Sequence, residues 1–365
     1  MSSEVSYIDL LMEMLSIPAT SRMENERSDF LEDYMKGLDY DVNRIHNNLL
    51  VGDHESKDTR PRILLNSHLD TVSPAEGWES DPFKPRLEGD KIIGLGSNDA
   101  GASVVTLIAT YQKLQAHLKD HLNLLLLISA EEEVSGANGI SAVLNLLGNL
   151  DAVIVGEPTG MHPAVAERGL MVLDGEIKGK AGHAARNEGE NAIYKALKDI
   201  ESIRELEFRD QSDWLPEPGA QVTMIKAGTG HNVVPDVCRY VVDVRSNDKY
   251  INEVVLERIR SVCMADLTPR STRLQPSSLE GDHFLMKTIT ECGLEPFGSS
   301  TLSDMALIPY PSVKMGPGDS ARSHSAGEYI LTGELNKGVE LYCRFLLTMK
   351  EILDIHVLNG DQLKP

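Results

Sequence analysis

Cysteine is scarce in this chain of 365 residues: there are four, and none of them forms a Cys-x-x-Cys pair. Neither a disulfide framework nor a thiolate zinc site is therefore expected, and a reducing cytoplasm fits best. Basic residues are also few, because 35 lysines and arginines stand against 56 aspartates and glutamates, for a net charge of -21. Such a charge opposes binding to nucleic acids and to anionic membrane surfaces.

Long apolar runs are missing as well. The longest apolar stretch, residues 122–130, contains Asn123 and Ser129 and has about half the length that a membrane-spanning helix needs. The first ten residues lack the basic segment and the cleavage site of a secretory signal. We therefore expect no membrane anchor and no export.

Short apolar segments alternate with helical patterns along residues 1–167, and the chain is too long for one ordinary compact core. This alternation predicts an α/β domain with a mixed, mainly parallel sheet flanked by helices. Residues 168–276 change to the order strand, helix, strand, strand, helix, strand, which predicts an inserted α+β domain of two layers. Residues 277–365 would complete the first domain. The expected helices are at 6–17, 28–39, 104–118, 137–147, 191–206, 251–264, 283–292 and 331–353, and the expected strands are at 40–42, 48–51, 63–66, 92–95, 122–129, 152–155, 170–178, 221–225, 239–245 and 312–315.

A histidine and a carboxylate follow the apolar strand at 63–66, in the segment Ser67-His68-Leu69-Asp70. Residues two apart in an extended segment point to the same side, so His68 and Asp70 share a face. A metal-bound imidazole usually donates its other N–H to a carboxylate, which fixes its orientation. By itself the triplet fits a metal ligand with its orienting carboxylate and a satisfied strand-end histidine equally well.

More carboxylates stand where other predicted strands end. Asp99 lies in a glycine-rich turn after the strand at 92–95, although an isolated aspartate there is more typical of a helix N-cap. Glu131, Glu132 and Glu133 follow the buried strand at 122–129, and their mutual repulsion favours a bound cation. Because adjacent side chains face opposite ways, one glutamate can bind metal while its neighbour carries a proton.

Two further candidates complete the set. Glu157 follows the strand at 152–155, and His324 lies after the strand at 312–315. Strand ends of this kind are where open α/β sheets bind their ligands. Two histidines and several carboxylates with no cysteine suit zinc, cobalt or manganese.

In this order the motifs resemble the co-catalytic zinc amidohydrolases, the family of acetylornithine deacetylase, succinyl-diaminopimelate desuccinylase, aminoacylase and carboxypeptidase G. The similarity extends over nearly the whole chain, including the inserted domain. The motifs are Ser67-His68-Leu69-Asp70, Gly96-Ser-Asn-Asp99, Ala130-Glu-Glu-Glu133, Gly156-Glu157-Pro158-Thr159 and Ser323-His324-Ser325.

The resemblance implies a centre of two Zn²⁺ ions, with Co²⁺ or Mn²⁺ as substitutes. Asp99 would bridge the ions, one of which His68 and Glu157 would bind, while Glu133 and His324 would bind the other. Asp70 would orient His68. Glu132 would be the general base and acid, with Glu131 in the position where the family usually has aspartate. The triple glutamate leaves this register open by one residue.

For the inserted domain the resemblance implies a lid and a dimerisation surface. His183, in Gly179-Lys-Ala-Gly-His183, would stabilise the developing oxyanion in the partner subunit's site of a homodimer. Asn232 and Arg245 would hold the substrate carboxylate. From the residues alone, His183 is typical of an exposed loop and Arg245 of a strand-end ion pair.

The expected function is hydrolysis of a small N-acyl amino acid, most closely N-acetylornithine or another N-acylornithine in arginine synthesis. The alternatives are a succinyl-diaminopimelate desuccinylase and a metallo-dipeptidase or carboxypeptidase. A non-catalytic metal-binding homologue is a remoter alternative, because the chain keeps Glu132 beside the five expected ligands. The chain departs from the family's pattern at several places: for example, Gly101 stands where a lysine is usual, and Met305-Ala306 follows Asp304 where an arginine is usual. These departures affect the identity of the substrate more than the chemistry.

Overall fold

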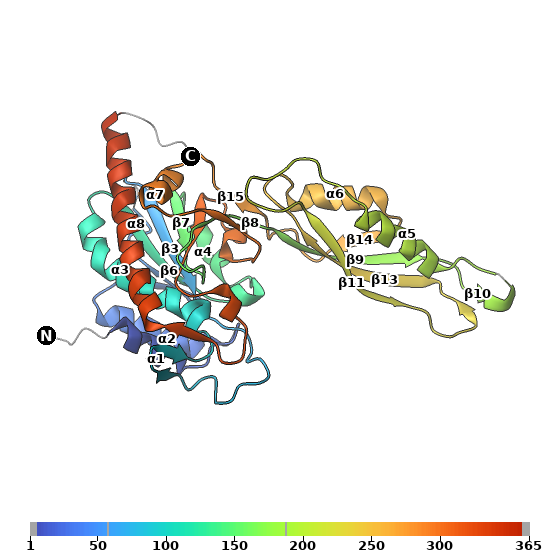
Figure 1. The fold of residues 1–365 in the computed structure, drawn as a ribbon, viewed down its shortest axis with the longest axis horizontal. Helices are drawn as coiled ribbons and strands as arrows, with labels where there is room; N and C mark the ends of the chain where they lie inside the picture. Colours follow the sequence, from blue (N-terminus) through green and yellow to red (C-terminus); the bar gives the residue numbers. More distant parts are fainter. Residues whose placement is uncertain (1–5, 57, 187, 360–365) are drawn as a thin grey trace. The chain divides into compact units, whose positions relative to one another are not determined.

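The computed structural model describes residues 6–56, 58–186 and 188–359, and it divides into two compact units (Figure 1). Unit 1 consists of Met1–Val165, Leu279–Phe297 and Ser303–Pro365, and unit 2 consists of Ala166–Ser278 and Gly298–Leu302. The predicted domain boundaries, at 168 and 276, differ from these divisions by two residues each, and the segment 298–302 was not expected in unit 2.

Unit 1 is built on a sheet whose central strands are parallel. β3 (Arg62–His68) lies between β6 (Asn123–Ser129) and β7 (Ala152–Val155) and is parallel to both. On the side of β6 the sheet continues with β2 (Asn48–Val51) and then β1 (Val42–Ile45). On the side of β7 it continues with β17 (Ser312–Lys314) and then β8 (Ala164–Glu167). β17 is parallel to β7, whereas β1, β2 and β8 join their neighbours antiparallel. The predicted mixed, mainly parallel sheet is confirmed.

Helices cover both faces of this sheet, which is why every residue of β6 and β7 is buried. On one face, Leu64 and Val153 belong to a single apolar cluster with Val143 of α4 (Ile140–Leu147). Alternate strand residues point to the opposite face, and α3 (Ala102–Leu118) lies against β3 and β6. The other elements of unit 1 are α1 (Tyr7–Leu15), α2 (Asn25–Gly37), α7 (Phe284–Glu291), α8 (Thr332–Asn359) and a small antiparallel sheet of β4 (Arg86–Glu88), β5 (Lys91–Ile93) and β18 (Tyr329–Leu331).

Unit 2 has two layers, an antiparallel sheet and a pair of helices. The sheet has the order β11 (Gly219–Ala227), β13 (Val237–Arg245), β9 (Leu170–Lys178) and β14 (Asp266–Pro269). Side chains from one face of the sheet form a core with Ala196 of α5 (Ala192–Arg204) and Val255 of α6 (Asn252–Val262). β10 (Gly182–His183) and β12 (Val233–Val234) form a separate two-stranded sheet, whereas β15 (Ser277–Ser278) and β16 (Phe297–Ser299) pair with β8.

Some predicted boundaries were wrong for identifiable reasons. The strand expected at 40–42 is β1 at Val42–Ile45, because a two-residue turn at 46–47 makes Ile45 pair with Asn48 in a hairpin. The helix expected from 137 begins at Ile140, after a turn that contains two glycines. The strand expected after the helix at 251–264 is β14. β8, β16 and β18 were not expected, since each has three or four residues and pairs with a strand distant in sequence. In the described part of the chain, no helix has the length and apolar character that crossing a membrane requires.

Candidate metal centre

The predicted metal ligands lie at one edge of the unit 1 sheet. His68 is the last residue of β3, the pair Glu132–Glu133 follows β6, and Glu157 follows β7. Because these three strands are parallel neighbours, their carboxyl ends meet at the same edge. Asp99 and His324 reach this edge from the loops that follow β5 and β17.

One half of the centre surrounds His68. The Nε2 atom of His68 lies 3.2 Å from Asp99 Oδ1 and 3.6 Å from Glu157 Oε1. Two atoms that are each bonded at about 2.1 Å to one tetrahedral zinc ion lie about 3.4 Å apart. The spacing of these three side chains therefore fits ligands that share a metal ion.

The other half surrounds His324. The Nε2 atom of His324 lies 3.0 Å from Glu133 Oε2 and 3.6 Å from Asp99 Oδ2. Asp99 thus turns one carboxylate oxygen towards each histidine, and the peptide bond that follows it is cis. This arrangement is compatible with the predicted role of Asp99 as a carboxylate that bridges two metal ions.

The acidic side chains of the centre repel one another. Burial raises the pKa of Glu132 well above its usual range, and the charges of Glu157 and Asp304 raise it further, although His68 opposes them. Burial and the charge of Asp99 likewise raise the pKa of Glu157, again against the effect of His68. A group of carboxylates that holds protons so tightly favours divalent cations, which would neutralise the same charges.

We expect the affinity of the protein for zinc to increase as the pH rises from about 6 to about 9. A hydrogen bond with Glu133 raises the pKa of His324 to about 9, and the charges of Glu133 and Asp99 act in the same direction. Histidine binds metal only when it is neutral, so below this pKa zinc must displace a proton. The affinity should then rise about tenfold per pH unit for each proton displaced.

This pH dependence can be measured by competition with a chromophoric chelator at several pH values. The His324→Ala protein, which has one protonated ligand fewer, should show a slope lower by about one. An affinity of the unchanged protein that does not vary with pH would contradict the assignment of His324.

Asp70 was predicted to orient His68, and the structure gives its carboxylate additional hydrogen-bond partners. The nearest partner of His68 Nδ1 is the backbone carbonyl oxygen of Asp70, at 3.0 Å, and the Asp70 Oδ1 lies further away, at 3.5 Å. The carboxylate instead accepts hydrogen bonds from the backbone N–H groups of Glu132 and Glu133, at 3.1 and 3.3 Å, and from the Ser21 hydroxyl at 2.7 Å. Asp70 therefore ties the end of β3 to the paired glutamates.

Glu328 supports the loop of Asp99, a role that no sequence motif predicted. Its carboxylate accepts hydrogen bonds from the backbone N–H groups of Gly96, Asn98 and Asp99, at 2.9 to 3.1 Å. Burial raises the pKa of Glu328 to about 7, although these hydrogen bonds oppose the shift. In the sequence, only its position four residues after His324 pointed to a role for Glu328. The loop of Asp99 lies more than two hundred residues away, so the sequence pattern could not show that the two are in contact.

A second missed carboxylate, Asp304, joins two strand ends. It is buried, and its Oδ2 accepts hydrogen bonds from Asn66 Nδ2 at 2.9 Å and from the Ser129 hydroxyl at 2.7 Å. Burial raises the pKa of Asp304 to about 6. Asn66 and Ser129 are polar residues near the ends of apolar strands. Such residues need a buried hydrogen-bonding partner, and this was the feature of the sequence from which Asp304 could have been found.

The remaining predicted residues, His183, Asn232 and Arg245, lie in unit 2. His183 pairs with Val233 across β10 and β12, and the Ala184 N–H donates to the Asn232 carbonyl oxygen at 3.1 Å. The structure therefore brings His183 and Asn232 together at one end of unit 2.

Arg245 lies at the other end of the unit 2 sheet. It is the last residue of β13, whose first residue, Val237, stands beside the segment of Asn232. Eight residues of extended strand span roughly 27 Å. Within one chain, Asn232 and Arg245 therefore cannot hold the same carboxylate. The Arg245 guanidinium forms two hydrogen bonds with the carboxylate of Asp243, at 2.8 and 3.1 Å.

Comparisons with known proteins cover most of the chain. The sequence profile of Peptidase family M20/M25/M40 matches residues 64–348. A succinyl-diaminopimelate desuccinylase of Colwellia psychrerythraea is 26% identical over 314 residues, which are 77% of this chain and 78% of that protein. A putative succinyl-diaminopimelate desuccinylase of Mycobacterium tuberculosis is 26% identical over 353 residues, which are 93% of this chain and 97% of that protein.

Solved structures share the fold. Aminopeptidase PepT of Bacillus cereus superposes with a TM-score of 0.76 at 21% identity, covering 94% of this chain and 98% of that one. The YXEP protein of Bacillus subtilis, described as a dinuclear metal-binding peptidase, gives a TM-score of 0.70 at 17% identity, covering 95% of this chain and 98% of that one.

Proposed function

Because the chain belongs to peptidase family M20/M25/M40 and is a metal-dependent amidohydrolase, we propose that it hydrolyses the amide bond of a small N-acyl amino acid. The products are a carboxylate and a free amino acid. The observation that carries the proposal is the position of Asp99, whose two carboxylate oxygens lie 3.2 Å from His68 Nε2 and 3.6 Å from His324 Nε2.

The described residues fit two zinc ions, one held by His68, Asp99 and Glu157 and the other by Asp99, Glu133 and His324. When bound, the ions would activate a water molecule and polarise the amide carbonyl. The two donor sets contain no thiolate, so cobalt or manganese would also fit.

Glu132 is the proposed proton carrier. Its Oε2 lies 3.9 Å from His68 Nε2, next to the ligands but further away than they are, and its side chain is 11% exposed. A carboxyl group whose pKa is raised by burial can take a proton from the attacking water and return it to the leaving amine. The contact of Glu133 with His324 supports the register in which Glu133 binds metal and Glu132 moves protons.

Two neighbouring arginines of unit 2 support an anionic substrate. The Nη2 of Arg168 donates to the Arg245 carbonyl oxygen at 3.0 Å. Burial, together with the charge of Arg245, lowers the pKa of Arg168. Its Nε is buried with no hydrogen-bond partner among the described residues. A planar guanidinium binds both oxygens of a carboxylate at once. We therefore assign substrate binding to Arg245 and also to Arg168, which no sequence motif indicated.

Two substrates are proposed. The sequence motifs favour an N-acylornithine, with N-acetylornithine first and arginine synthesis as the setting. The names of the relatives favour N-succinyl-diaminopimelate instead. Each has an amide next to at least one carboxylate group, which the two arginines of unit 2 suit.

A substrate panel on the zinc-loaded protein tests the reaction and its specificity. N-acetylornithine, N-succinylornithine, N-succinyl-diaminopimelate and an unmodified dipeptide would be compared by kcat/KM. We expect an N-acylornithine to exceed the dipeptide at least about tenfold. Activity on the dipeptide alone would overturn the deacylase proposal and favour an exopeptidase.

A homodimer through unit 2 is part of the proposal. β11 is an edge strand of the unit 2 sheet, and its Met224 and Ile225 are 64% and 53% exposed. On α5, which packs against β11, Tyr194 and Leu197 are 67% and 53% exposed. An unpaired edge next to exposed apolar side chains suits a second copy of the chain. In such a dimer His183 and Asn232 would serve the metal centre of the partner subunit.

Replacing both Ile225 and Tyr194 with glutamate is expected to give a monomer that still binds two zinc ions. Its kcat should fall about 10²-fold, because the oxyanion donor His183 of the other chain is then missing. Sedimentation equilibrium, zinc analysis and kinetics measure the three properties. Leu87→Glu, at a 54% exposed apolar position of unit 1, is the matched control and should stay dimeric. A monomer with full kcat would contradict the role of His183.

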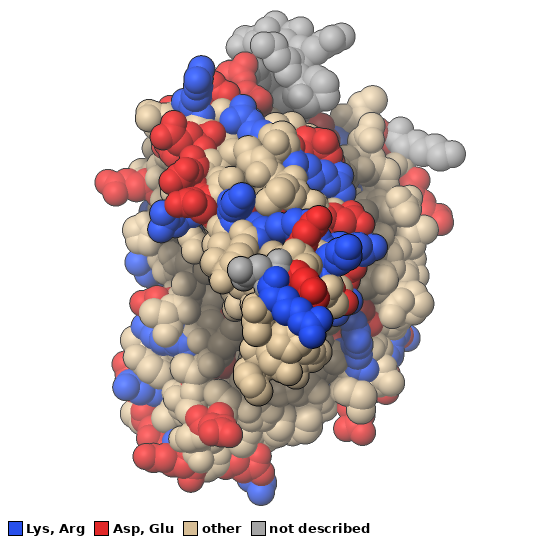
Figure 2. Space-filling model, turned by 90° about the vertical axis from the view of Figure 1, so that its right-hand side faces the viewer, with Lys and Arg blue, Asp and Glu red and all other residues tan. Residues whose placement is uncertain are grey.

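Nucleic acids and membranes are not proposed partners. Figure 2 shows acidic side chains distributed among basic and uncharged ones on the face that it presents, and the net charge of -21 repels polyanions. The four cysteines are free thiols, which supports a reducing, cytoplasmic location.

A further inference from the structure

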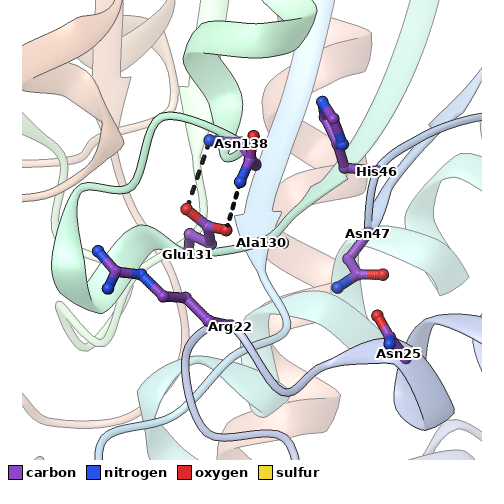
Figure 3. A pocket seen from close by; sticks show the side chains of 7 residues that line it. All are labelled: Arg22, Asn25, His46, Asn47, Ala130, Glu131 and Asn138. Atoms are coloured by element: carbon purple, nitrogen blue, oxygen red, sulfur yellow. Dashed lines mark hydrogen bonds between the residues drawn. The ribbon is translucent and has the colours of Figure 1, made fainter.

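The three consecutive glutamates after β6 do not point the same way. Glu132 and Glu133 lie beside the histidines of the metal centre, whereas Glu131 turns towards Asn138 and is 7% exposed. The Oε1 of Glu131 accepts a hydrogen bond from Asn138 Nδ2 at 3.0 Å, and its Oε2 accepts one from the Asn138 backbone N–H at 3.3 Å (Figure 3). These two donors occupy the Glu131 carboxylate away from the metal centre.

The backbone around Glu131 is built for this side chain. Glu131 has a φ of 54°, a left-handed conformation that a residue with a Cβ adopts only where its surroundings impose it. Gly136 leaves the necessary space, because a Cβ at that position would lie 1.8 Å from Glu131 Oε2. The Gly136 N–H also donates to the Glu131 carbonyl oxygen at 2.8 Å. Both the main chain and the side chain of Glu131 therefore close the turn that carries the next two glutamates.

Two other buried polar side chains hold the ends of the same turn. Glu24 is fully buried, and its Oε1 accepts a hydrogen bond from the Glu131 N–H at 3.3 Å. Asn48 is also fully buried, donates to the Asn138 carbonyl oxygen at 2.6 Å and accepts from the Ala130 N–H at 2.9 Å. The turn at 130–138 is thus held by three carboxylate or amide side chains, of which that of Glu131 is the central one.

We infer that Glu131 is a positioning residue that directs Glu132 and Glu133 to their separate places in the metal centre. It holds neither a metal ion nor a proton of the reaction. Outer partners of this kind set the geometry of the groups that do, and their loss typically costs 10- to 100-fold in metal affinity or activity. The kinetic part of this inference rests on the proposed function, whereas the metal-binding part does not.

Glu131→Ala tests the inference on the full-length protein. We expect zinc binding to weaken roughly 10- to 100-fold and kcat to fall by a similar factor, with KM changed less than about threefold. Glu131 also lines a cavity of about 490 Å³ with Arg22 and His46 (Figure 3). Water can therefore fill the space that the substitution leaves, and the variant is expected to fold. Zinc affinity is measured by competition with a chromophoric chelator.

Two further variants separate positioning from general destabilisation. Asp151 accepts a hydrogen bond from the Arg62 N–H at 2.8 Å, at the opposite ends of β3 and β7 from the metal centre. Asp151→Ala should lower Tm but leave zinc affinity and kcat unchanged. Asn138→Ala removes one of the two donors to Glu131, so its loss should be smaller. The double variant Glu131→Ala/Asn138→Ala should be no worse than Glu131→Ala, because the two residues act through one interaction.

The inference is overturned if Glu131→Ala keeps zinc affinity and kcat within about twofold of the unchanged protein. It is also overturned if Asp151→Ala lowers Tm as much as Glu131→Ala does and loses as much zinc affinity and kcat as that variant. Should the unchanged protein hydrolyse no compound of the panel, the proposed function fails, and the zinc titration alone then decides the role of Glu131.

Discussion

Replacing Glu132 with glutamine is expected to lower kcat by about 10²- to 10⁴-fold while the protein still binds two zinc ions. The amide has nearly the shape of the carboxylate but cannot accept and return a proton. Glu132 stands next to the ligands at 3.9 Å from His68 Nε2, and burial raises its pKa. Since the lost interaction acts only during the reaction, kcat and kcat/KM should fall together.

Steady-state kinetics and zinc analysis of the same preparation check this result. Glu132→Asp is the matched variant, because it keeps the acid but withdraws it by one methylene, and its loss should be smaller. Near-normal turnover of Glu132→Gln with two bound zinc ions would remove Glu132 from the mechanism. Loss of a zinc ion from that variant would instead favour the other register of the glutamate triplet, in which Glu132 is a ligand.

Replacing Asp99 with asparagine is expected to reduce the zinc content from two ions to one or none and kcat/KM by at least about 10³-fold. Asp99 turns Oδ1 towards His68 and Oδ2 towards His324. An amide has one oxygen that can bind metal and a nitrogen that cannot, so it cannot bridge. The substitution also removes a negative charge that would lie between the two ions.

Asp70→Asn is the matched control for this experiment. Asp70 is buried in the same centre, but its carboxylate contacts backbone N–H groups and a hydroxyl, and its carbonyl oxygen contacts His68. The Asp70→Asn protein should keep two zinc ions, with affinity or activity reduced about 10- to 100-fold. Two tightly bound ions in Asp99→Asn would show that Asp99 does not bridge them.

Much of the fold and of the candidate metal centre could be predicted, because strands and strand ends are local features of a sequence. The apolar runs at 63–66, 122–129 and 152–155 predicted the central strands β3, β6 and β7, and the structure pairs them in parallel. Parallel strands end at one edge, so residues such as His68 and Glu157 had to meet there. Short strands like β8 and β18 were missed, because their pairing depends on distant partners and not on local periodicity.

The sequence by itself therefore determined the parallel sheet, the candidate ligands of the metal centre and the family, since periodicity, residue type and motif order encode these. Only the tertiary structure decided how each side chain is used. In the structure His68 Nδ1 lies nearest the carbonyl oxygen of Asp70, Glu131 turns to Asn138, and Arg245 stands far from Asn232. These arrangements depend on backbone angles and on contacts between segments distant in sequence. The physical reason is that a carboxylate can serve as ligand, proton carrier or hydrogen-bond acceptor, and its neighbours in space select among these roles.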